Sequence, residues 1–426
     1  MKVLVYPHDL DMGGSQLSAI ELAAAVRDLG HEVNVYGRPG ILCSRIEELG
    51  LTFIEGPAPT RRPSPGVVGD LRSRLRSGRY DVVHGYEWPP ALEARLACLG
   101  SRTACVGTVM SMAVAPFIPF NLPLVVGTAQ IADVERRAGR SDLRVIEPPV
   151  DVVHNRPDPT RDLHAFRTAH GVPEGRHVVC VTRLAAQLKL EGLLTAISVV
   201  PDLGDDVVLT IVGDGPAHDP VMQAADEAND ARGRQAVVLT GELEDPRPAY
   251  AMADVVLGMG GSALRAMAFA KPVVVQGESG YWHTLTPETL ATFQWTGWYG
   301  VGEGEDAGPD RLRVELTTLL SDAHLRATLG AFSRETVTSA YSLDAAAQTQ
   351  VDVYEGAVRR HAGHGVRVVD DGRALSGLVA YKVGRLASRL HGESVADDFN
   401  ARPVAMTDRT AHRRVGPTEP QPARGG

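Results

Sequence analysis

The hydrophobic positions of this chain form two patterns that alternate along its length. Val3–Tyr6 is a short, β-branched apolar run, and Leu17–Leu29 repeats apolar residues at helical spacing until Gly30. His31–Tyr36 is the next strand-like run, so these segments predict a strand–helix–strand unit with a short crossover. Short apolar strands that alternate with helices predict a parallel sheet covered by helices on both faces.

The alternation is interrupted once, in a stretch that contains several prolines. Prolines occur within Ile146–Asp151, and Pro157 and Pro159 follow among polar residues, which indicates a linker between two domains. The further strands expected are Asp81–His84 before the linker and His177–Thr182, Val207–Val212, Ala236–Thr240, Asp254–Leu257 and Pro272–Val275 after it. The pattern predicts an α/β protein with two doubly wound Rossmann-like sheets that face each other across a cleft. In such sheets ligands bind beyond the carboxyl ends of the strands.

We expect four segments along the chain. One Rossmann-like domain spans residues 1–155, a second spans 156–343, and a closing helix occupies 344–362. Residues 363–426 form an accessory segment, in which Leu375–Leu390 has the spacing of an amphipathic helix and the tail after Asp397 has the composition of a disordered region. The basic residues of this helix suit a solvated face, with peripheral membrane contact or a protein partner as alternatives.

Composition narrows the class of protein. The 426 residues are 44% hydrophobic and 22% charged, which is typical of a globular protein. The formal net charge of -9 argues against a general attraction to nucleic acid. The four cysteines lack CxxC spacing, and no apolar run reaches the ~20 residues of a membrane helix, so we expect a cytoplasmic protein without a metal site. Only four lysines occur among many arginines, a bias that suggests a GC-rich, actinobacterial genome.

A glycine-rich turn and a pair of cations could carry chemistry. Gly13 and Gly14 precede the first predicted helix, where a bare backbone can approach a phosphate, although any tight strand-to-helix turn favours glycine. Arg183 and Lys189 follow the end of a predicted strand. A guanidinium fork and an ammonium suit a diphosphate and would stabilise the charge on it as it leaves, unless both are ordinary solvated side chains.

A second glycine-rich turn lies late in the second domain. In Leu257–Ala268 a strand runs into glycines and a helix opens, so the N–H groups of Gly260, Gly261 and Ser262 are expected to face an anion. The same segment fits the dinucleotide pattern G-x-G-x-x-A, with Glu278 about 20 residues further on. Because that pattern normally opens the first strand–helix–strand unit of a fold, its late position argues against NAD.

Taken in order, these motifs resemble family 4 glycosyltransferases. The resemblance rests on the glycine pair at 13–14, RLAAQLKLEG from 183, IVGDGP from 211, ALRAMAFAKPVVV from 263 and PPVD at the linker, and covers roughly residues 1–360. It implies the GT-B fold of two Rossmann-like domains, a nucleotide-sugar donor, transfer with retention of configuration, and no metal or other cofactor. It also implies a C-terminal helix that crosses back to the first domain, which suits Asp344–Arg359.

The resemblance also assigns roles to residues. Gly13 and Gly14 match a loop that approaches the donor phosphates and the acceptor. Arg183 and Lys189 match the pair that grips the donor diphosphate. Gly260 matches a glycine whose neighbouring N–H groups meet the diphosphate or the sugar.

The sequence departs from the family at three points. Leu257 and Arg265 replace two glutamates, of which the second commonly accepts hydrogen bonds from the nucleotide ribose. Met110 takes the place of a histidine near the donor sugar, and the spacing from arginine to lysine is one residue longer than in many members. Because arginine has only donors, the ribose is held differently, or Arg265 contacts a phosphate or an acidic acceptor, or donor binding is impaired.

Further polar residues complete the expected site. His84 and Glu87 follow an N-domain strand and could bind the acceptor or take its proton, with capping or packing as the alternative. Glu278 lies beyond a C-domain strand and could receive donor hydroxyls. The expected donor-binding residues are Gly13, Gly14, Gly260, Gly261, Ser262, Arg265 and Glu278, and the expected acceptor-binding residues are Gln16, His84, Glu87 and Met110.

The sequence therefore predicts a metal-independent, retaining glycosyltransferase in which Arg183 and Lys189 are catalytic. The donor would carry UDP or GDP, and the acceptor would be a small metabolite or natural product of secondary metabolism. Three alternatives stay open: a glycosyltransferase-like protein that binds nucleotide sugars without catalysis, an NAD-dependent oxidoreductase, and a sugar-nucleotide epimerase.

Overall fold

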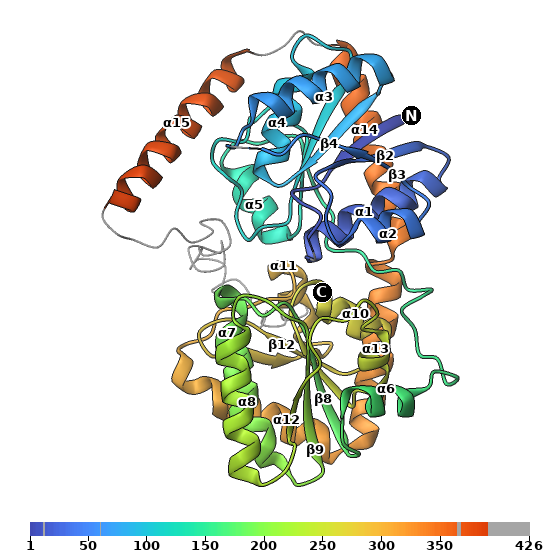
Figure 1. The fold of residues 1–426 in the computed structure, drawn as a ribbon, viewed down its shortest axis with the longest axis vertical. Coiled ribbons are helices and arrows are strands. Elements are labelled where there is room, and N and C mark those ends of the chain that lie inside the picture. The colour runs from blue at the N-terminus through green and yellow to red at the C-terminus, as the bar shows by residue number, and fades with distance from the viewer. Residues whose placement is uncertain (12, 60, 364–367, 391–426) are drawn as a thin grey trace, which may run out of the picture.

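The computed structural model describes residues 1–11, 13–59, 61–363 and 368–390, and arranges them around two α/β sheets (Figure 1). Seven parallel strands form the first sheet, in the order β3-β2-β1-β4-β5-β6-β7. Its strands are β1 (Lys2–Tyr6), β2 (Glu32–Gly37), β3 (Thr52–Glu55), β4 (Val82–Tyr86), β5 (Ala104–Val109), β6 (Leu124–Val126) and β7 (Leu143–Val145). All residues of β4 and β5 are buried, which explains why these strands are apolar on both faces.

Helices cover both faces of this first sheet. Those between its strands are α1 (Gly14–Asp28), α2 (Cys43–Glu48), α3 (Pro65–Gly78), α4 (Trp88–Cys98) and α5 (Ala129–Arg137). Alternate residues of β1 separate the two cores: Val3 and Val5 pack with α1 and α2, whereas Leu4 packs with α3, α4 and α5. The period-two alternation of a strand is what divides the core in this way.

The second sheet has six strands in the order β10-β9-β8-β11-β12-β13. Its strands are β8 (Arg176–Val181), β9 (Val207–Val212), β10 (Val237–Leu239), β11 (Val255–Gly258), β12 (Val273–Gln276) and β13 (Trp282–Thr284). The pairing of β13 with β12 is antiparallel, and all the other pairs are parallel. The prediction of two doubly wound α/β sheets is confirmed, while the antiparallel edge strand was not predicted.

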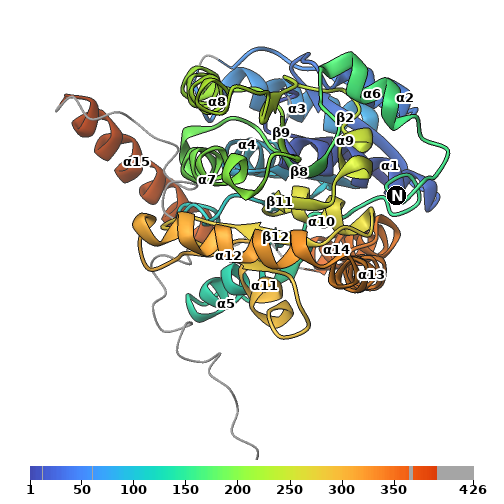
Figure 2. The same cartoon turned by 90° about the horizontal axis from the view of Figure 1, so that it is seen from below.

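Helices also cover both faces of the second sheet (Figure 2). Its helices are α6 (Leu163–His170), α7 (Ala186–Val199), α8 (His218–Arg232), α9 (Arg247–Met252), α10 (Gly261–Ala268), α11 (Leu290–Thr296), α12 (Gly308–Ser321) and α13 (Ala323–Ala340). One core joins the sheet to α7, α8 and α12, and the other joins it to α9, α10 and α13.

The chain crosses between the two sheets twice, and the crossings pair with each other. The Val150 N–H donates to the Tyr341 carbonyl at 2.9 Å, and the Leu343 N–H donates back to the Val150 carbonyl at 2.9 Å. After the second crossing, α14 (Leu343–Gly363) packs on α1 and β5 of the first sheet (Figure 1). The chain thus returns to the first domain through α14.

The accessory segment begins with α15 (Val368–Leu390), which starts earlier than Leu375. Tyr381 of this helix lies against Phe117 and Trp88 of the first domain, with ring centroids 5.0 and 6.2 Å apart. The tail after Asp397, which was expected to be disordered, lies outside the described residues. No helix in the described part of the chain is both long and apolar enough to cross a membrane.

His84 lies in the interior, contrary to its expected place at the acceptor site. Its side chain on β4 is 0% exposed. Its Nδ1 lies 2.8 Å from the Tyr354 hydroxyl on α14, and its Nε2 lies 2.6 Å from the Thr108 hydroxyl on β5. With both ring nitrogens engaged, His84 fastens α14 to the sheet and does not face an acceptor. The prediction is wrong because β4 continues to Tyr86, so His84 lies inside a strand whose two faces are both covered.

We predict that acid destabilises the fold through His84. Burial lowers its pKa to about 3, whereas an unfolded histidine titrates near 6.5. Between these values the unfolded chain binds a proton that the folded chain excludes. The free energy of unfolding therefore falls as the pH drops below 6.5, by up to about 1.4 kcal/mol per pH unit. Urea unfolding at several pH values between about pH 7 and pH 5 measures this slope.

The matched comparison is a histidine that carries no such contacts. His84→Asn should flatten the pH dependence, and His324→Asn, at an exposed position on α13, should leave it unchanged. Equal slopes for the His84→Asn variant and the unaltered protein would contradict the assignment.

Candidate active site

The expected donor residues lie at the carboxyl edge of the second sheet, on two neighbouring strands. Leu257 of β11 pairs with Cys180 of β8 in parallel. The loop that carries Arg183 and the turn that ends at Gly260 therefore leave the sheet side by side. This is the place where open α/β sheets bind ligands.

The loop after β8 is held by the turn after β9. The Leu184 N–H donates to the Asp214 carbonyl at 3.0 Å, and the Leu184 carbonyl accepts from the Ala217 N–H at 2.9 Å. Gly213 has a φ of 137°, and a side chain there would overlap the carbonyl oxygen of Thr182. Asp214 thus supports the loop, and the Arg183 side chain remains exposed.

Lys189 lies at the true start of the helix that follows. Gln187 and Leu188 have non-helical dihedral angles, with φ of 66° at Leu188, so regular α7 geometry begins at Lys189. Leu188 packs against Met259 and Tyr299, which brings this helix start next to the turn before α10. Desolvation lowers the pKa of Lys189 to about 8.

The start of α10 has fewer free N–H groups than the sequence predicted. The Gly260 N–H donates to the Trp298 carbonyl at 2.9 Å, and the Ser262 N–H donates to the Met259 carbonyl at 3.3 Å. The Ser262 hydroxyl also bonds to the Met259 main chain. Among the described residues, the Gly261 N–H alone of the three has no partner. The expectation for Gly260 and Ser262 fails because Trp298, from the segment after α11, and Met259, within the turn, accept these N–H groups.

The two departures at the family's glutamate positions have structural explanations. Leu257 is fully buried in the core beside α7. Arg265 pairs with Glu21 of α1, with Nη2 3.3 Å from Oε2. Arg265 is thus engaged by the other domain, which does not fit its expected contact with the donor.

Glu278 lies in a loop that a glutamate from α7 holds in place. The Glu278 carboxylate accepts a hydrogen bond from the Tyr299 hydroxyl. The next two N–H groups, of Ser279 and Gly280, donate to the carboxylate of Glu191 at 2.9 and 2.7 Å. Sequence reasoning missed Glu191, although it lies two residues after Lys189 in the same motif.

On the facing domain, Glu87 joins three loops at the carboxyl edge of the first sheet. Its carboxylate accepts from the Met110 N–H at 2.9 Å, the Ser111 hydroxyl at 2.7 Å and the Ser15 hydroxyl at 3.4 Å. Glu87 itself has a φ of 66°, which costs a non-glycine residue about 1–3 kcal/mol. Backbone strain of this kind persists only where the surrounding contacts hold the residue in that conformation. Met110 is held through its backbone, so its side chain is not part of this network.

Gly13 and Gly14 begin α1 near the same edge of the sheet. Gly13 is the N-cap residue of α1, and Gly14 is exposed with open space where a side chain would lie. Gln16 donates from Nε2 to Asp9 at 2.7 Å. Gln16 therefore ties the helix start to the loop after β1.

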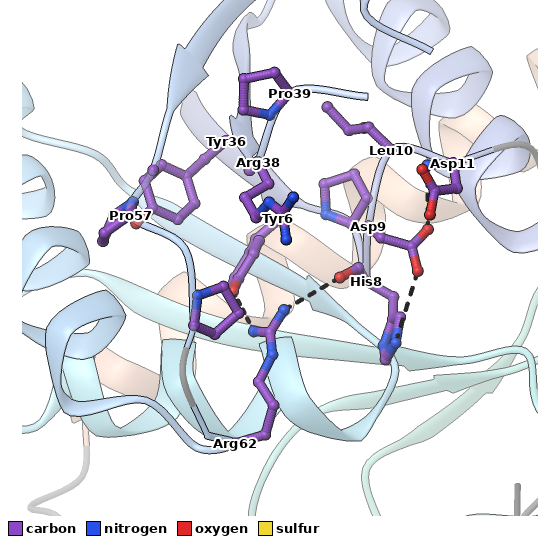
Figure 3. A pocket seen from close by; sticks show the side chains of 14 residues that line it. Tyr6, His8, Asp9, Leu10, Asp11, Tyr36, Arg38, Pro39, Pro57 and Arg62 are labelled. Atoms are coloured by element: carbon purple, nitrogen blue, oxygen red, sulfur yellow. Dashed lines mark hydrogen bonds and ion pairs between the residues drawn. The ribbon is translucent and has the colours of Figure 1, made fainter. Parts of the chain in front are cut away.

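A cavity of about 140 Å³ lies at the ends of β1, β2 and β3 (Figure 3). Arg62 enters it and donates to the Tyr6 hydroxyl at 2.6 Å, with the fully buried Glu93 as its counter-ion. Asp9 and Asp11 lie on the opposite side of the cavity from Arg62 (Figure 3). The cavity thus combines carboxylate acceptors with a guanidinium donor, and sequence reasoning did not find it because its parts come from separate loops.

The described residues contain no group of three or more His, Cys, Asp or Glu side chains that could hold a metal ion. Cys43, Cys98, Cys105 and Cys180, which all lie within the described residues, form no disulfide bonds.

Two Rossmann-like domains in one chain are the architecture of GT-B proteins. Family models place the chain within this class. The model of Glycosyltransferase Family 4 matches residues 12–188, and that of glycosyl transferases group 1 matches residues 175–286. Together they span well over half of the sequence. The chain belongs to the family 4-like glycosyltransferases.

Curated relatives come from mycobacteria. A GDP-mannose-dependent alpha-(1-6)-phosphatidylinositol monomannoside mannosyltransferase of Mycobacterium tuberculosis is 29% identical over 231 residues, which cover 51% of this chain and 56% of the relative. A phosphatidyl-myo-inositol mannosyltransferase of Mycolicibacterium smegmatis is 27% identical over 274 residues, which cover 58% and 66%. The chain thus spans between half and two thirds of the length of these relatives.

Solved structures share the fold at lower identity. A glycosyltransferase from Rickettsia africae has a TM-score of 0.67 at 15% identity, covering 84% of this chain and 98% of its own. Anabaena HepE in complex with UDP has a TM-score of 0.65 at 16% identity, covering 84% and 100%. Both support the two-domain architecture.

We predict that Glu191→Gln loosens the loop that carries Glu278. A glutamine keeps one acceptor oxygen but turns an NH2 group toward the second backbone N–H, which loses its partner at a cost of about 1–3 kcal/mol. The free energy of unfolding should fall by this amount, and proteolysis of the native protein should become faster at residues 277–281. Glu227→Gln, on the exposed surface of α8, serves as the control. An unchanged free energy of unfolding would show that Glu191 does not hold the loop.

Proposed function

We propose that this chain transfers a sugar from a nucleotide-sugar donor to a hydroxyl group of an acceptor, with retention of anomeric configuration and without a metal ion or other cofactor. The observation that carries the proposal is the pairing of β8 with β11. It sets Arg183, Lys189 and the free N–H of Gly261 at one edge of one sheet. Two cations and a helix start in that arrangement suit a diphosphate.

The chemistry that these residues would perform is stabilisation of the leaving group. As the bond between the sugar carbon and the diphosphate oxygen breaks, negative charge grows on the diphosphate. Arg183 and Lys189 would balance that charge, and the Gly261 N–H would donate to it. The acceptor hydroxyl would attack from the face that the diphosphate leaves, and its proton would pass to the leaving phosphate oxygen. No protein nucleophile is required.

The donor is expected to be a nucleoside diphosphate sugar. The mycobacterial relatives are described as GDP-mannose-dependent or as mannosyltransferases, and Anabaena HepE has been solved with UDP and with UDP-glucose. These donors share the diphosphate that Arg183 and Lys189 would hold. Glu278, kept in place by Glu191, would accept hydrogen bonds from sugar hydroxyls.

The acceptor would enter through the cavity in the first domain. Asp9 and Asp11 would accept hydrogen bonds from hydroxyl groups, and Arg62 would donate one. A polyhydroxylated ring suits such a mixture better than an apolar molecule. The names of the relatives favour an inositol-type ring carried by a lipid over the small metabolite expected from the sequence. Transfer assays with free polyols and with phosphatidylinositol acceptors separate these two cases.

A donor-binding protein without catalysis is the second candidate, because Arg265 occupies the position of an expected ribose contact. Release of UDP or GDP from a panel of nucleotide sugars would exclude it. NAD binding is disfavoured, because the Gly260 N–H that the dinucleotide pattern requires is bonded to Trp298.

We predict that Arg183→Ala and Lys189→Ala each reduce turnover by about 10²–10³-fold, the loss typical of a removed transition-state contact. Release of nucleoside diphosphate from GDP-mannose and UDP-glucose gives the rate. Arg232→Ala, an exposed basic residue on α8, is the control and should keep full activity. Full activity in either active-site variant, with the fold intact by circular dichroism, would refute the proposal.

We predict that nucleotide affinity falls above about pH 8. The ammonium of Lys189, with its pKa lowered to about 8, loses its proton above that pH and with it the attraction to a diphosphate. The dissociation constant of GDP or UDP should rise by up to about tenfold per pH unit, as measured by calorimetry. Lys189→Arg should remove this dependence because a guanidinium stays charged. A pH dependence that survives in the arginine variant would assign the titration to another group.

A further inference from the structure

A charged pair joins the two domains directly behind the glycine turns of the candidate site. Arg265 of α10 reaches Glu21 of α1, with 3.3 Å between Nη2 and Oε2. The side chains are only 20% and 11% exposed. The other oxygen of Glu21 lies 3.8 Å from Nη2 of Arg45, which belongs to the same domain as Glu21. Glu21 is thus a buried carboxylate whose main partner comes from the opposite domain.

The position of the pair links it to both ligand edges. α1 begins at Gly14 and α10 begins at Gly261, and the two helices lie across from each other where the domains meet (Figure 1). At 1.5 Å per residue, Glu21 lies about 10 Å along α1 and Arg265 about 6 Å along α10. A change in the Glu21–Arg265 distance therefore changes the distance between the two glycine turns.

Beside the pair the neighbouring contacts are apolar, and a further contact between the domains is made by α5 against α11. Met112 of the first domain packs against an apolar group of the second that includes Met259 and Tyr299. Pro148 of the linker lies near Gly261. Apolar contacts of this kind tolerate sliding, because hydrophobic attraction has no preferred direction. A hydrogen-bonded guanidinium and carboxylate do have a preferred geometry.

The two chain crossings near Val150 and Tyr341 form a point about which the domains could rotate relative to each other. They hydrogen-bond to each other and lie at the junction of the two domains. A rotation about this point would separate α1 from α10 and break the ion pair. Because both side chains are largely buried, loss of Glu21 would leave Arg265 without its counter-ion, and loss of Arg265 would leave Glu21 with only the 3.8 Å contact to Arg45.

We infer that the Glu21–Arg265 pair is an interdomain clamp that sets the spacing between the Gly13–Gly14 turn and the Gly260–Gly261 turn. Arg265 is then a positioning residue and not a ligand of the donor. The effect of the clamp on the rate of sugar transfer rests on the proposed function. The clamp itself is a property of the ligand-free protein, so the two ideas can fail separately.

Small-angle X-ray scattering of the full ligand-free chain tests the clamp. Glu21→Gln and Arg265→Gln should each increase the radius of gyration, and the double variant should increase it no further, because all three lack the same contact. Arg45→Gln is the matched control: it removes the partner of Glu21 within the domain and should keep the compact form. High salt should expand the unaltered protein and leave the double variant unchanged.

Nucleotide binding gives the second readout. With GDP and UDP as probes, Glu21→Gln and Arg265→Gln should weaken binding by the same factor, on the order of fivefold or more. Arg265→Lys keeps the charge and should restore part of the affinity and the compact form. If Arg265→Gln fails to fold, Arg265→Lys and Glu21→Gln still provide the test.

Two results would overturn the inference. If Arg265→Gln weakens GDP and UDP binding while Glu21→Gln leaves it unchanged, Arg265 contacts the nucleotide. If neither glutamine variant changes the radius of gyration, the pair does not hold the domains together. Absence of sugar transfer by the unaltered protein would refute the proposed function alone.

Discussion

The parallel pairing of β8 with β11 is the constraint on which the candidate site depends. Parallel neighbours end at the same edge, so the Arg183 loop, the start of α7 and the start of α10 emerge together. The loops are then held by contacts that have no direct part in chemistry. The turn around Asp214 supports the Arg183 loop, and Glu191 supports the loop of Glu278. Desolvation at this edge lowers the pKa of Lys189 to about 8.

The first domain has a matching organisation around Glu87. The carboxylate of Glu87, a residue with a positive φ, joins the start of α1 to the loop after β5, as Glu191 joins α7 to the loop after β12. Each domain thus uses one carboxylate to hold loops at its ligand edge. The Glu21–Arg265 pair connects the two edges, and α14 returns to the first sheet, where Tyr354 meets His84. For the proposed transfer reaction, this arrangement would supply two preformed halves, with the inferred clamp setting the distance between them.

Much of the fold was predictable because it rests on local patterns. Buried strands such as β4 and β9 are apolar on both faces, and helix starts such as that of α10 follow glycine turns. The antiparallel β13 was missed because three residues carry too little periodicity. The motifs around 13, 183 and 260 follow β1, β8 and β11, as the sequence predicted. The roles of individual groups could not be predicted as well from the sequence. The Gly260 N–H and Arg265 were expected to contact a ligand, but each has a partner within the protein.

The sequence by itself determined two doubly wound sheets, a linker between them and a cationic motif after a strand of the second, because periodicity and glycine placement are local properties. The tertiary structure decided which polar groups remain free for a ligand. His84 became a core residue, Arg265 became the partner of Glu21, and the cavity of Asp9 and Arg62 arose from loops far apart in the chain. The physical reason is that a polar side chain takes the partner that folding brings within reach, and such a partner can lie hundreds of residues away.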